Sequence, residues 1–90
     1  MYNYLINYSK KASKDLLLIE QQKAIYDKTE KLIAIIRNNP YQNPPVYEKL
    51  KGNMKDAYSR RINKKHRLVY DVYENKKEIY VHSILSHYEF

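Results

Sequence analysis

The spacing of the apolar residues changes twice along this chain of 90 residues, and these changes restrict the folds open to it. From Tyr2 to Tyr8, aromatic and aliphatic side chains occupy every second position, which is typical of a strand with one buried face. From Ser9, a good helix N-cap, to about Gln22 the apolar residues recur at helical spacing, and they do so again from about Ala24 to Arg37. The first half of the chain is therefore predicted to form one strand followed by a helical hairpin.

The second half begins with a proline-rich segment, residues 41–46, and then returns to a period of two. Pro44 and Pro45 can neither continue a helix nor donate to an inner strand, so this segment is predicted to be a stiff loop that leads to Glu48. The alternation that follows predicts three strands joined by turns at 63–65 and 74–77. These strands are Ala57–Asn63, His66–Tyr73 and Glu78–Tyr88.

Alternation in the middle strand separates a largely apolar face from a partly charged one. Leu68 and Tyr70 share one face, whereas Arg67 points to the other. The simplest assembly is an α+β fold, in which an antiparallel meander packs its apolar face on the helical hairpin and leaves a flat or concave basic face. Residues 1–90 are expected to form a single domain, because the chain has one glycine, three prolines and no low-complexity linker.

The composition excludes several classes of protein. The chain has no cysteine, which removes disulfides and thiolate metal sites and fits a reducing compartment. Its longest purely apolar run, Leu16 to Ile19, is far shorter than the roughly 20 residues that cross a bilayer. We therefore expect a soluble, cytoplasmic protein with no membrane partner.

Positive charge is concentrated in one segment of the chain. Residues 49–67 hold eight basic side chains against one acid, Asp56, and so carry the whole formal net charge of +7. Such clustering favours binding to a polyanion such as a nucleic acid. The lysines that we expect to steer phosphates toward this surface are Lys49, Lys51, Lys55, Lys64 and Lys65.

The residues around this basic segment could also cleave RNA. Cleavage without a metal requires a base for the 2′-OH, a positive charge on the phosphate and an acid for the departing 5′ oxygen. Glu48 would be the base and His87 the acid. Arg61 and Arg67 would hold phosphate oxygens, and Tyr88 would orient or stack a base. Arg60 must point to the face opposite Arg61, so parity prefers Arg61.

The other histidines are interpreted differently. His66 shares the face of Leu68 and Tyr70, so we interpret it as a partly buried, hydrogen-bonded residue outside the site. His82 lies out of phase with His87 on the last predicted strand, so the two side chains should emerge on opposite faces. This arrangement argues against a shared metal.

Two alternatives remain open at this point. Glu48 and His87 could be ordinary surface residues of a non-catalytic basic module that blocks the ribosome, or binds nucleic acid, by occupancy. The protein could instead cut free RNA, because nothing in the composition says where the substrate is presented.

Four segments, taken together, resemble the YoeB/Txe toxins of the RelE-like superfamily of bacterial toxin-antitoxin systems. They are Tyr47–Gly52, Tyr58–Asn63, His66–Tyr70 and Ser86–Tyr88. The resemblance implies a RelE-like fold and an mRNA endonuclease that enters the ribosomal A site, contacts ribosomal RNA and cuts the message without a metal or cofactor. The family's base is carried over to Glu48, its acid to His87 and its C-terminal tyrosine to Tyr88, with Arg61 and Arg67 as the phosphate-binding arginines.

The resemblance also implies a protein partner. An acidic antitoxin of the YefM or Axe type would fold its C-terminal segment onto the toxin and cover the basic face. A homodimer is also known in the family, and the sequence leaves this chain's own oligomeric state open.

Overall fold

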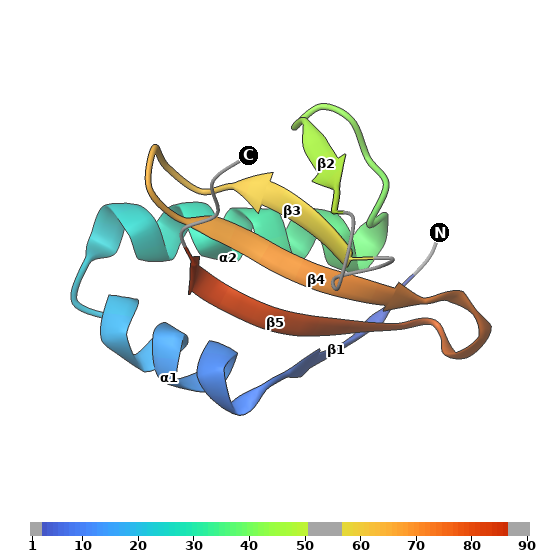
Figure 1. Cartoon of the computed structure of the whole chain (residues 1–90), viewed down its shortest axis with the longest axis horizontal. Helices are drawn as coiled ribbons and strands as arrows, with labels where there is room; N and C mark the ends of the chain where they lie inside the picture. The colour runs from blue at the N-terminus through green and yellow to red at the C-terminus, as the bar shows by residue number, and fades with distance from the viewer. Residues whose placement is uncertain (1–2, 51–56, 87–90) are drawn as a thin grey trace.

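The structure is a computed structural model that describes residues 3–50 and 57–86 (Figure 1). The elements in chain order are β1 (Leu5–Tyr8), α1 (Lys10–Ile19), α2 (Lys23–Asn38), β2 (Tyr47–Lys49), β3 (Ala57–Arg61), β4 (Arg67–Tyr73), the 3-10 helix η2 (Glu74–Lys76) and β5 (Glu78–Ser86). This order confirms the predicted α+β fold: a strand, a helical hairpin and then a meander. None of the helices in the described part of the chain is long and apolar enough to cross a membrane.

The strands form one sheet in the order β1-β5-β4-β3-β2, and its topology corrects the prediction in one respect. The meander is antiparallel as expected, but β1 runs parallel to β5, so the sheet is mixed. A parallel pair needs a long crossover connection, and the two helices lie within the connection that supplies it. The segment after the proline-rich loop, predicted only to lead to the next element, forms the short edge strand β2.

Both predicted helices are present, with shifted ends. Ser9 caps α1 as expected, since its Oγ accepts a hydrogen bond from the amide of Ala12 at 2.9 Å. The first helix ends at Ile19, before the predicted Gln22, and the second is one residue longer at each end than predicted. In Figure 1, α2 runs behind the sheet and α1 lies along β5.

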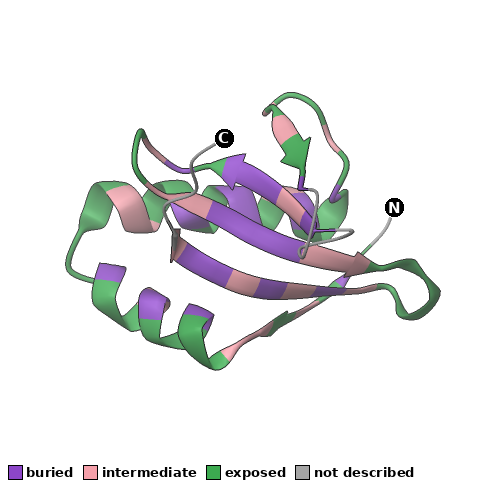
Figure 2. Cartoon of the chain, in the orientation of Figure 1, coloured by how far each residue is buried: buried purple, intermediate pink, exposed green. Residues whose placement is uncertain are grey.

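The main core lies between the helices and the sheet (Figure 2). Its fully buried members include Ile19 from α1, Ile36 from α2, and Leu68, Tyr70 and Ile84 from the strands. A smaller cluster lies on the opposite face of the sheet and joins Leu50, Ala57 and Val69. The face predicted to be basic is therefore apolar in its middle, and its basic residues lie toward one end.

Arg60 fastens the proline-rich loop to the sheet. Its guanidinium is completely buried and donates to the Tyr70 hydroxyl at 2.9 Å. It also donates to the carbonyls of Pro45 at 2.7 Å, Gln42 at 2.9 Å and Pro40 at 3.0 Å. Burial raises the pKa of Tyr70 to about 12, so this hydroxyl stays protonated and accepts from Arg60 while donating to Pro40. The loop predicted to be stiff from its prolines is thus held by a residue of β3.

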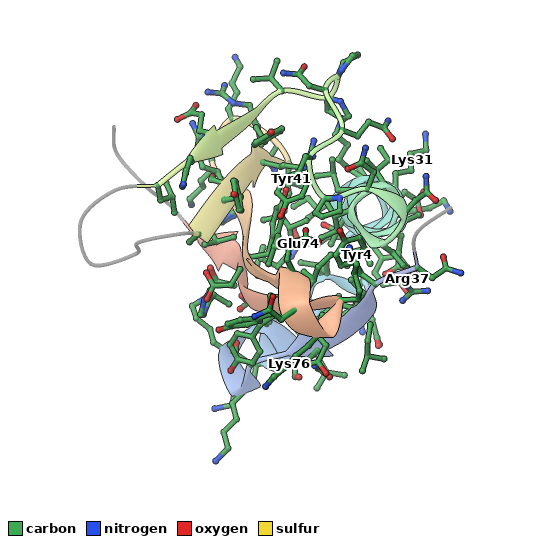
Figure 3. All side chains as sticks on the ribbon, turned by 90° about the vertical axis from the view of Figure 1, so that its right-hand side faces the viewer. Tyr4, Lys31, Arg37, Tyr41, Glu74 and Lys76 are labelled. Carbon is green, nitrogen blue, oxygen red and sulfur yellow. The ribbon has the colours of Figure 1, made fainter. Side chains whose placement is uncertain are left out.

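Glu74 ties the turn between β4 and β5 to two distant segments (Figure 3). Its carboxylate accepts from the hydroxyls of Tyr41 at 2.7 Å and Tyr4 at 2.9 Å, and from the ammonium of Lys77 at 2.7 Å. These three donors, Lys77 first, lower the pKa of Glu74 to about 2. At the end of the sheet where β4 turns into β5, polar contacts therefore join the N-terminal segment and the proline-rich loop to the β4–β5 turn.

Candidate functional site

Three of the predicted site residues meet on the outer face of the sheet, where β2, β3 and β4 lie side by side (Figure 1). Glu48 on β2 lies opposite Ser59, and Arg61 on β3 lies opposite Arg67 on β4. Because alternate residues of a strand share a face, Glu48, Arg61 and Arg67 project to the same side. They line a hollow of about 420 Å³, and Val46, Ser59 and Lys64 line it as well.

The charges in this hollow are arranged around one carboxylate. Nη1 of Arg67 lies 3.6 Å from Oε1 of Glu48. The Arg67 side chain is only 13% exposed, whereas that of Glu48 is 49% exposed, so the guanidinium is sheltered and the carboxylate can be reached from solvent. A base must be reachable by its substrate, and a charge that is to stabilise an anion acts more strongly when water is partly excluded.

The two arginines favour an anion between them. Arg61 and Arg67 are direct cross-strand partners, and such pairs have Cβ atoms about 4.5–5.5 Å apart. Like charges in this arrangement repel each other, and Lys28 and Lys64 also line the hollow, so Glu48 supplies one negative charge against four positive ones. A phosphate group would add negative charge, and guanidinium groups can bind its oxygens in pairs. The geometry suits a site for a phosphodiester.

The lysines predicted to steer phosphates are placed differently from one another. Lys64 lines the hollow, and Lys65 is exposed beside it in the β3–β4 turn. Lys49 alternates with Glu48 on β2 and therefore projects to the opposite face, away from the hollow. Lys51 and Lys55 lie outside the described residues, as do the predicted acid His87 and the predicted tyrosine Tyr88.

The structure adds residues that the sequence argument did not select. Ser59, the partner of Glu48 on the neighbouring strand β3, is completely buried, and within the described part of the chain its hydroxyl has no hydrogen-bond partner. Ser59 lies two residues before Arg61, so strand alternation could have placed it on the same face from the sequence. Asn63 shapes the turn beside the hollow, because its side-chain oxygen accepts from the amides of Lys65 at 2.8 Å and His66 at 2.7 Å. An asparagine that opens a turn is a recognisable signal of this contact.

The two histidines within the described residues lie away from Glu48. His66 is half-buried, as predicted, but it lies just before β4, which begins at Arg67 and not at His66. His82 places Nε2 at 2.8 Å from Oδ2 of Asp71, and its ring contacts Tyr80 edge to face. Among residues 3–50 and 57–86, no group of three or more His, Asp or Glu side chains is arranged to hold a metal ion.

Comparison with known proteins identifies relatives over most of the chain. Residues 8–88 match the family described as "YoeB-like toxin of bacterial type II toxin-antitoxin system". The curated protein "Toxin YoeB" of Escherichia coli (strain K12) is 42% identical over 53 residues, which cover 59% of this chain and 63% of that relative. The match thus spans less than two thirds of the length of the curated relative.

Solved structures agree with this family. A YoeB/ParE toxin from Agrobacterium tumefaciens superposes with a TM-score of 0.86 at 26% identity, covering 93% of this chain and 99% of that one. The YoeB-YefM complex from Staphylococcus aureus gives 0.80 at 36% identity, covering 96% and 99%. The predicted RelE-like fold is therefore confirmed, and the chain belongs to the family of YoeB-like toxins of bacterial type II toxin-antitoxin systems.

Proposed function

We propose that this chain is a ribosome-dependent mRNA endonuclease, the toxin component of a type II toxin-antitoxin system, which cleaves the message in the A site by metal-independent general acid-base catalysis. The observation that carries the proposal is the meeting of Glu48 with Arg67 and Arg61 in one hollow. The membership of this chain in the family of YoeB-like toxins supports the same activity. The site of action would be the cytoplasm, where messages are translated.

Each residue of the site has a defined task in this reaction. Glu48, half-exposed at the rim, takes the proton from the 2′-OH, and the 2′ oxygen then forms a bond to phosphorus. Arg67 and Arg61 stabilise the charge that builds on the phosphate oxygens. The bond from phosphorus to the 5′ oxygen breaks as His87 donates a proton, which leaves a cyclic phosphate and a 5′-OH. Tyr88 orients the nucleotide.

The lysines are assigned to binding rather than to chemistry. Lys64 lines the hollow and Lys65 is exposed next to it in the chain, and Lys49, Lys51 and Lys55 belong to the same basic segment. They would hold phosphates of the message or of ribosomal RNA. Losing any one of them should weaken binding more than it slows the chemical step.

The decisive experiment is the substitution Glu48→Gln, assayed by message cleavage on programmed ribosomes. Loss of the base should slow cleavage by about a hundredfold or more, with binding to the ribosome retained. Glu30→Gln on α2 is the matched control, because Glu30 is exposed and lies outside the hollow. Cleavage by Glu48→Gln at the rate of the control would refute the mechanism.

The concentration of charge around Arg61 and Lys64 favours a second candidate, a basic module that blocks the ribosome by occupancy. Such a protein would inhibit translation equally well with Gln at position 48. It would also create no new 5′-OH ends on the message. Mapping those ends with and without ribosomes separates this candidate from the nuclease, and also tests cleavage of free RNA.

We also propose an acidic antitoxin as the partner of this chain. The solved relatives include a YoeB-YefM complex from Staphylococcus aureus, and a separate structure of a YoeB dimer from the same organism. A YefM-like segment would cover the basic face by charge complementarity. Sedimentation of the chain alone, and with such an acidic segment, would give the stoichiometry and test self-association.

A further inference from the structure

The hollow that holds Glu48 and Arg67 reaches beyond the outer face of the sheet. It is also lined by Ile62, which belongs to the core between the sheet and the helices, and by Lys28 of α2. Figure 1 shows α2 running behind the strands, so the hollow continues past the end of β3 toward the helix layer. The reaction proposed above uses only the part of the hollow that the strands form.

Lys28 has no neutralising partner on its own helix. An acid three or four residues away could pair with it. The four positions at these spacings hold Ala24, Ile25, Lys31 and Leu32. Lys23, by contrast, has Asp27 four residues further on, and its Nζ lies 3.4 Å from Oδ2 of Asp27. Lys28 is exposed, and none of the ion pairs within residues 3–50 and 57–86 includes it.

The charge of the hollow is more than one phosphate can balance. Four cations line it, Lys28, Arg61, Lys64 and Arg67, against the single carboxylate of Glu48, so four minus one leaves a formal net charge of +3. A phosphodiester group carries one negative charge. The scissile phosphate alone would therefore leave two positive charges uncompensated, and these repel each other in a partly sheltered site. A second phosphate in the hollow would reduce this surplus.

The size and polarity of the hollow also suit a ligand larger than one phosphate group. Its volume of about 420 Å³ lies within the range of about 300–1,000 Å³ that is typical of pockets for whole small molecules. The Ser59 hydroxyl lines it, is fully buried, and finds no hydrogen-bond partner among the residues that the structure describes. A buried hydroxyl without a partner costs free energy, which a polar ligand would recover.

We propose that Lys28 is a substrate-binding residue that holds a phosphate next to the scissile one, so that two consecutive phosphates of the message occupy the hollow. The inference rests on the proposed function, because it extends the RNA of that reaction by one linkage. Arg61 and Arg67 hold the scissile phosphate, and Lys28 binds its neighbour from the helix layer. Lys28 takes no part in making or breaking bonds. It fixes the direction in which the strand crosses the hollow.

The first test measures kcat and KM of Lys28→Met for cleavage of a defined message on programmed ribosomes. Losing a contact that is equally strong in the ground and transition states should raise KM about fivefold and leave kcat within about twofold. Lys28→Arg keeps the charge and should retain the KM of the unmodified chain. Lys31→Met is the matched control, because Lys31 is an exposed lysine of the same helix that does not line the hollow. Its KM should stay within about 1.5-fold of the unmodified value.

The second test distinguishes a phosphate of the message from one of ribosomal RNA. Messages are made with a neutral methylphosphonate at the linkage just before, or just after, the scissile one. At the linkage that Lys28 binds, the neutral group should raise KM about fivefold for the unmodified chain. It should raise KM less than about twofold for Lys28→Met, because that contact is already lost. Lys31→Met should respond to both messages as the unmodified chain does.

The outcomes separate the inference from the proposed function. Coupling between Lys28 and one of the two neighbouring linkages supports the inference. A Lys28→Met variant with unchanged KM overturns it, as does a raised KM that couples to neither linkage, and both leave the proposed function intact. A fall in kcat at unchanged KM overturns it too, since Lys28 would then act on the chemical step. If the unmodified chain leaves the message uncut, the proposed reaction itself fails, and the inference fails with it.

Discussion

Replacing Arg60 with methionine should destabilise this protein more than any equivalent change on the outer face of the sheet. The Arg60 guanidinium is fully buried and donates to four acceptors, the Tyr70 hydroxyl and the carbonyls of Pro40, Gln42 and Pro45. Methionine fills a similar volume but donates nothing. The substitution would take the Arg60 donor away from the carbonyls of Gln42 and Pro45, and would leave the Pro40 carbonyl with the Tyr70 hydroxyl.

The magnitude follows from two opposing terms. Hydrogen bonds from a charged donor contribute about 1.5–3 kcal/mol each, so four of them give a gross loss of about 6–12 kcal/mol. Removing a buried charge returns several kcal/mol of desolvation cost, which leaves a net loss of about 3–5 kcal/mol. For a chain of this size, each kcal/mol lowers the melting temperature by about 4–8 °C, so Arg60→Met should melt at least about 12 °C lower.

The assay is urea and thermal unfolding followed by circular dichroism, with Arg61→Met as the matched control. Arg61 is the next residue on the same strand, but it is exposed on the opposite face, so its replacement should change the free energy of unfolding by less than about 1 kcal/mol. Equal stabilities for the two variants would refute the argument that Arg60 anchors the loop. The Arg60→Met variant should also cleave poorly, since the loop that Arg60 holds leads directly into β2 and Glu48.

Two further predictions concern charge. The pKa of Glu74 is lowered to about 2, so its carboxylate stabilises the fold fully above the ordinary pKa of 4.5 and loses that effect as the pH falls toward 2. Unfolding curves of Glu74→Gln and of the unmodified chain should therefore differ at pH 6 and converge near pH 2, and a constant difference between them would contradict this. Arg67→Lys keeps the positive charge beside Glu48 but loses the planar guanidinium that can bind two phosphate oxygens, so cleavage on programmed ribosomes should slow by about tenfold with the melting temperature nearly unchanged. A rate equal to that of the unmodified chain would show that Arg67 does not bind the phosphate in this bidentate way.

Local patterns were enough to predict the elements and part of the site. The helical spacing in α1 and α2, the N-cap at Ser9 and the period of two in β3, β4 and β5 all depend on residues a few positions apart, and each was confirmed. Parity along β3 also separated Arg61, which faces the hollow, from Arg60, which is buried. The roles of these residues in catalysis remain proposals.

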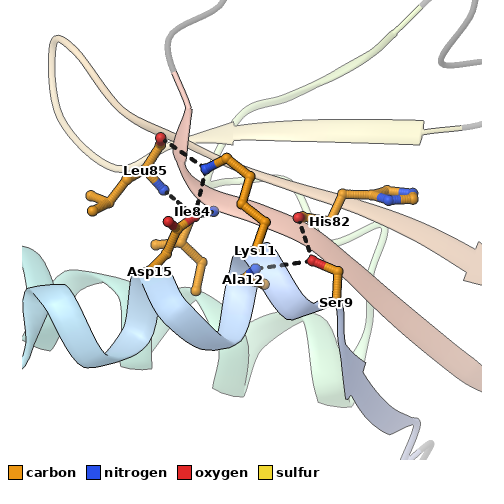
Figure 4. A network of polar contacts seen from close by, with 7 residues as sticks. All are labelled: Ser9, Lys11, Ala12, Asp15, His82, Ile84 and Leu85. Carbon is orange, nitrogen blue, oxygen red and sulfur yellow. Dashed lines mark hydrogen bonds and ion pairs between the residues drawn. The ribbon is translucent and has the colours of Figure 1, made fainter.

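Contacts between distant segments could not be predicted in this way. The parallel pairing of β1 with β5, the carboxylate of Asp15 on the amides of Ile84 and Leu85 (Figure 4), and the loop carbonyls on Arg60 each join residues that no local spacing relates. Sequence periodicity shows which face of an element is buried, because burial repeats with the turn of a helix or the pleat of a strand. It does not show which polar groups meet there, since that depends on how elements pack once the whole chain has folded.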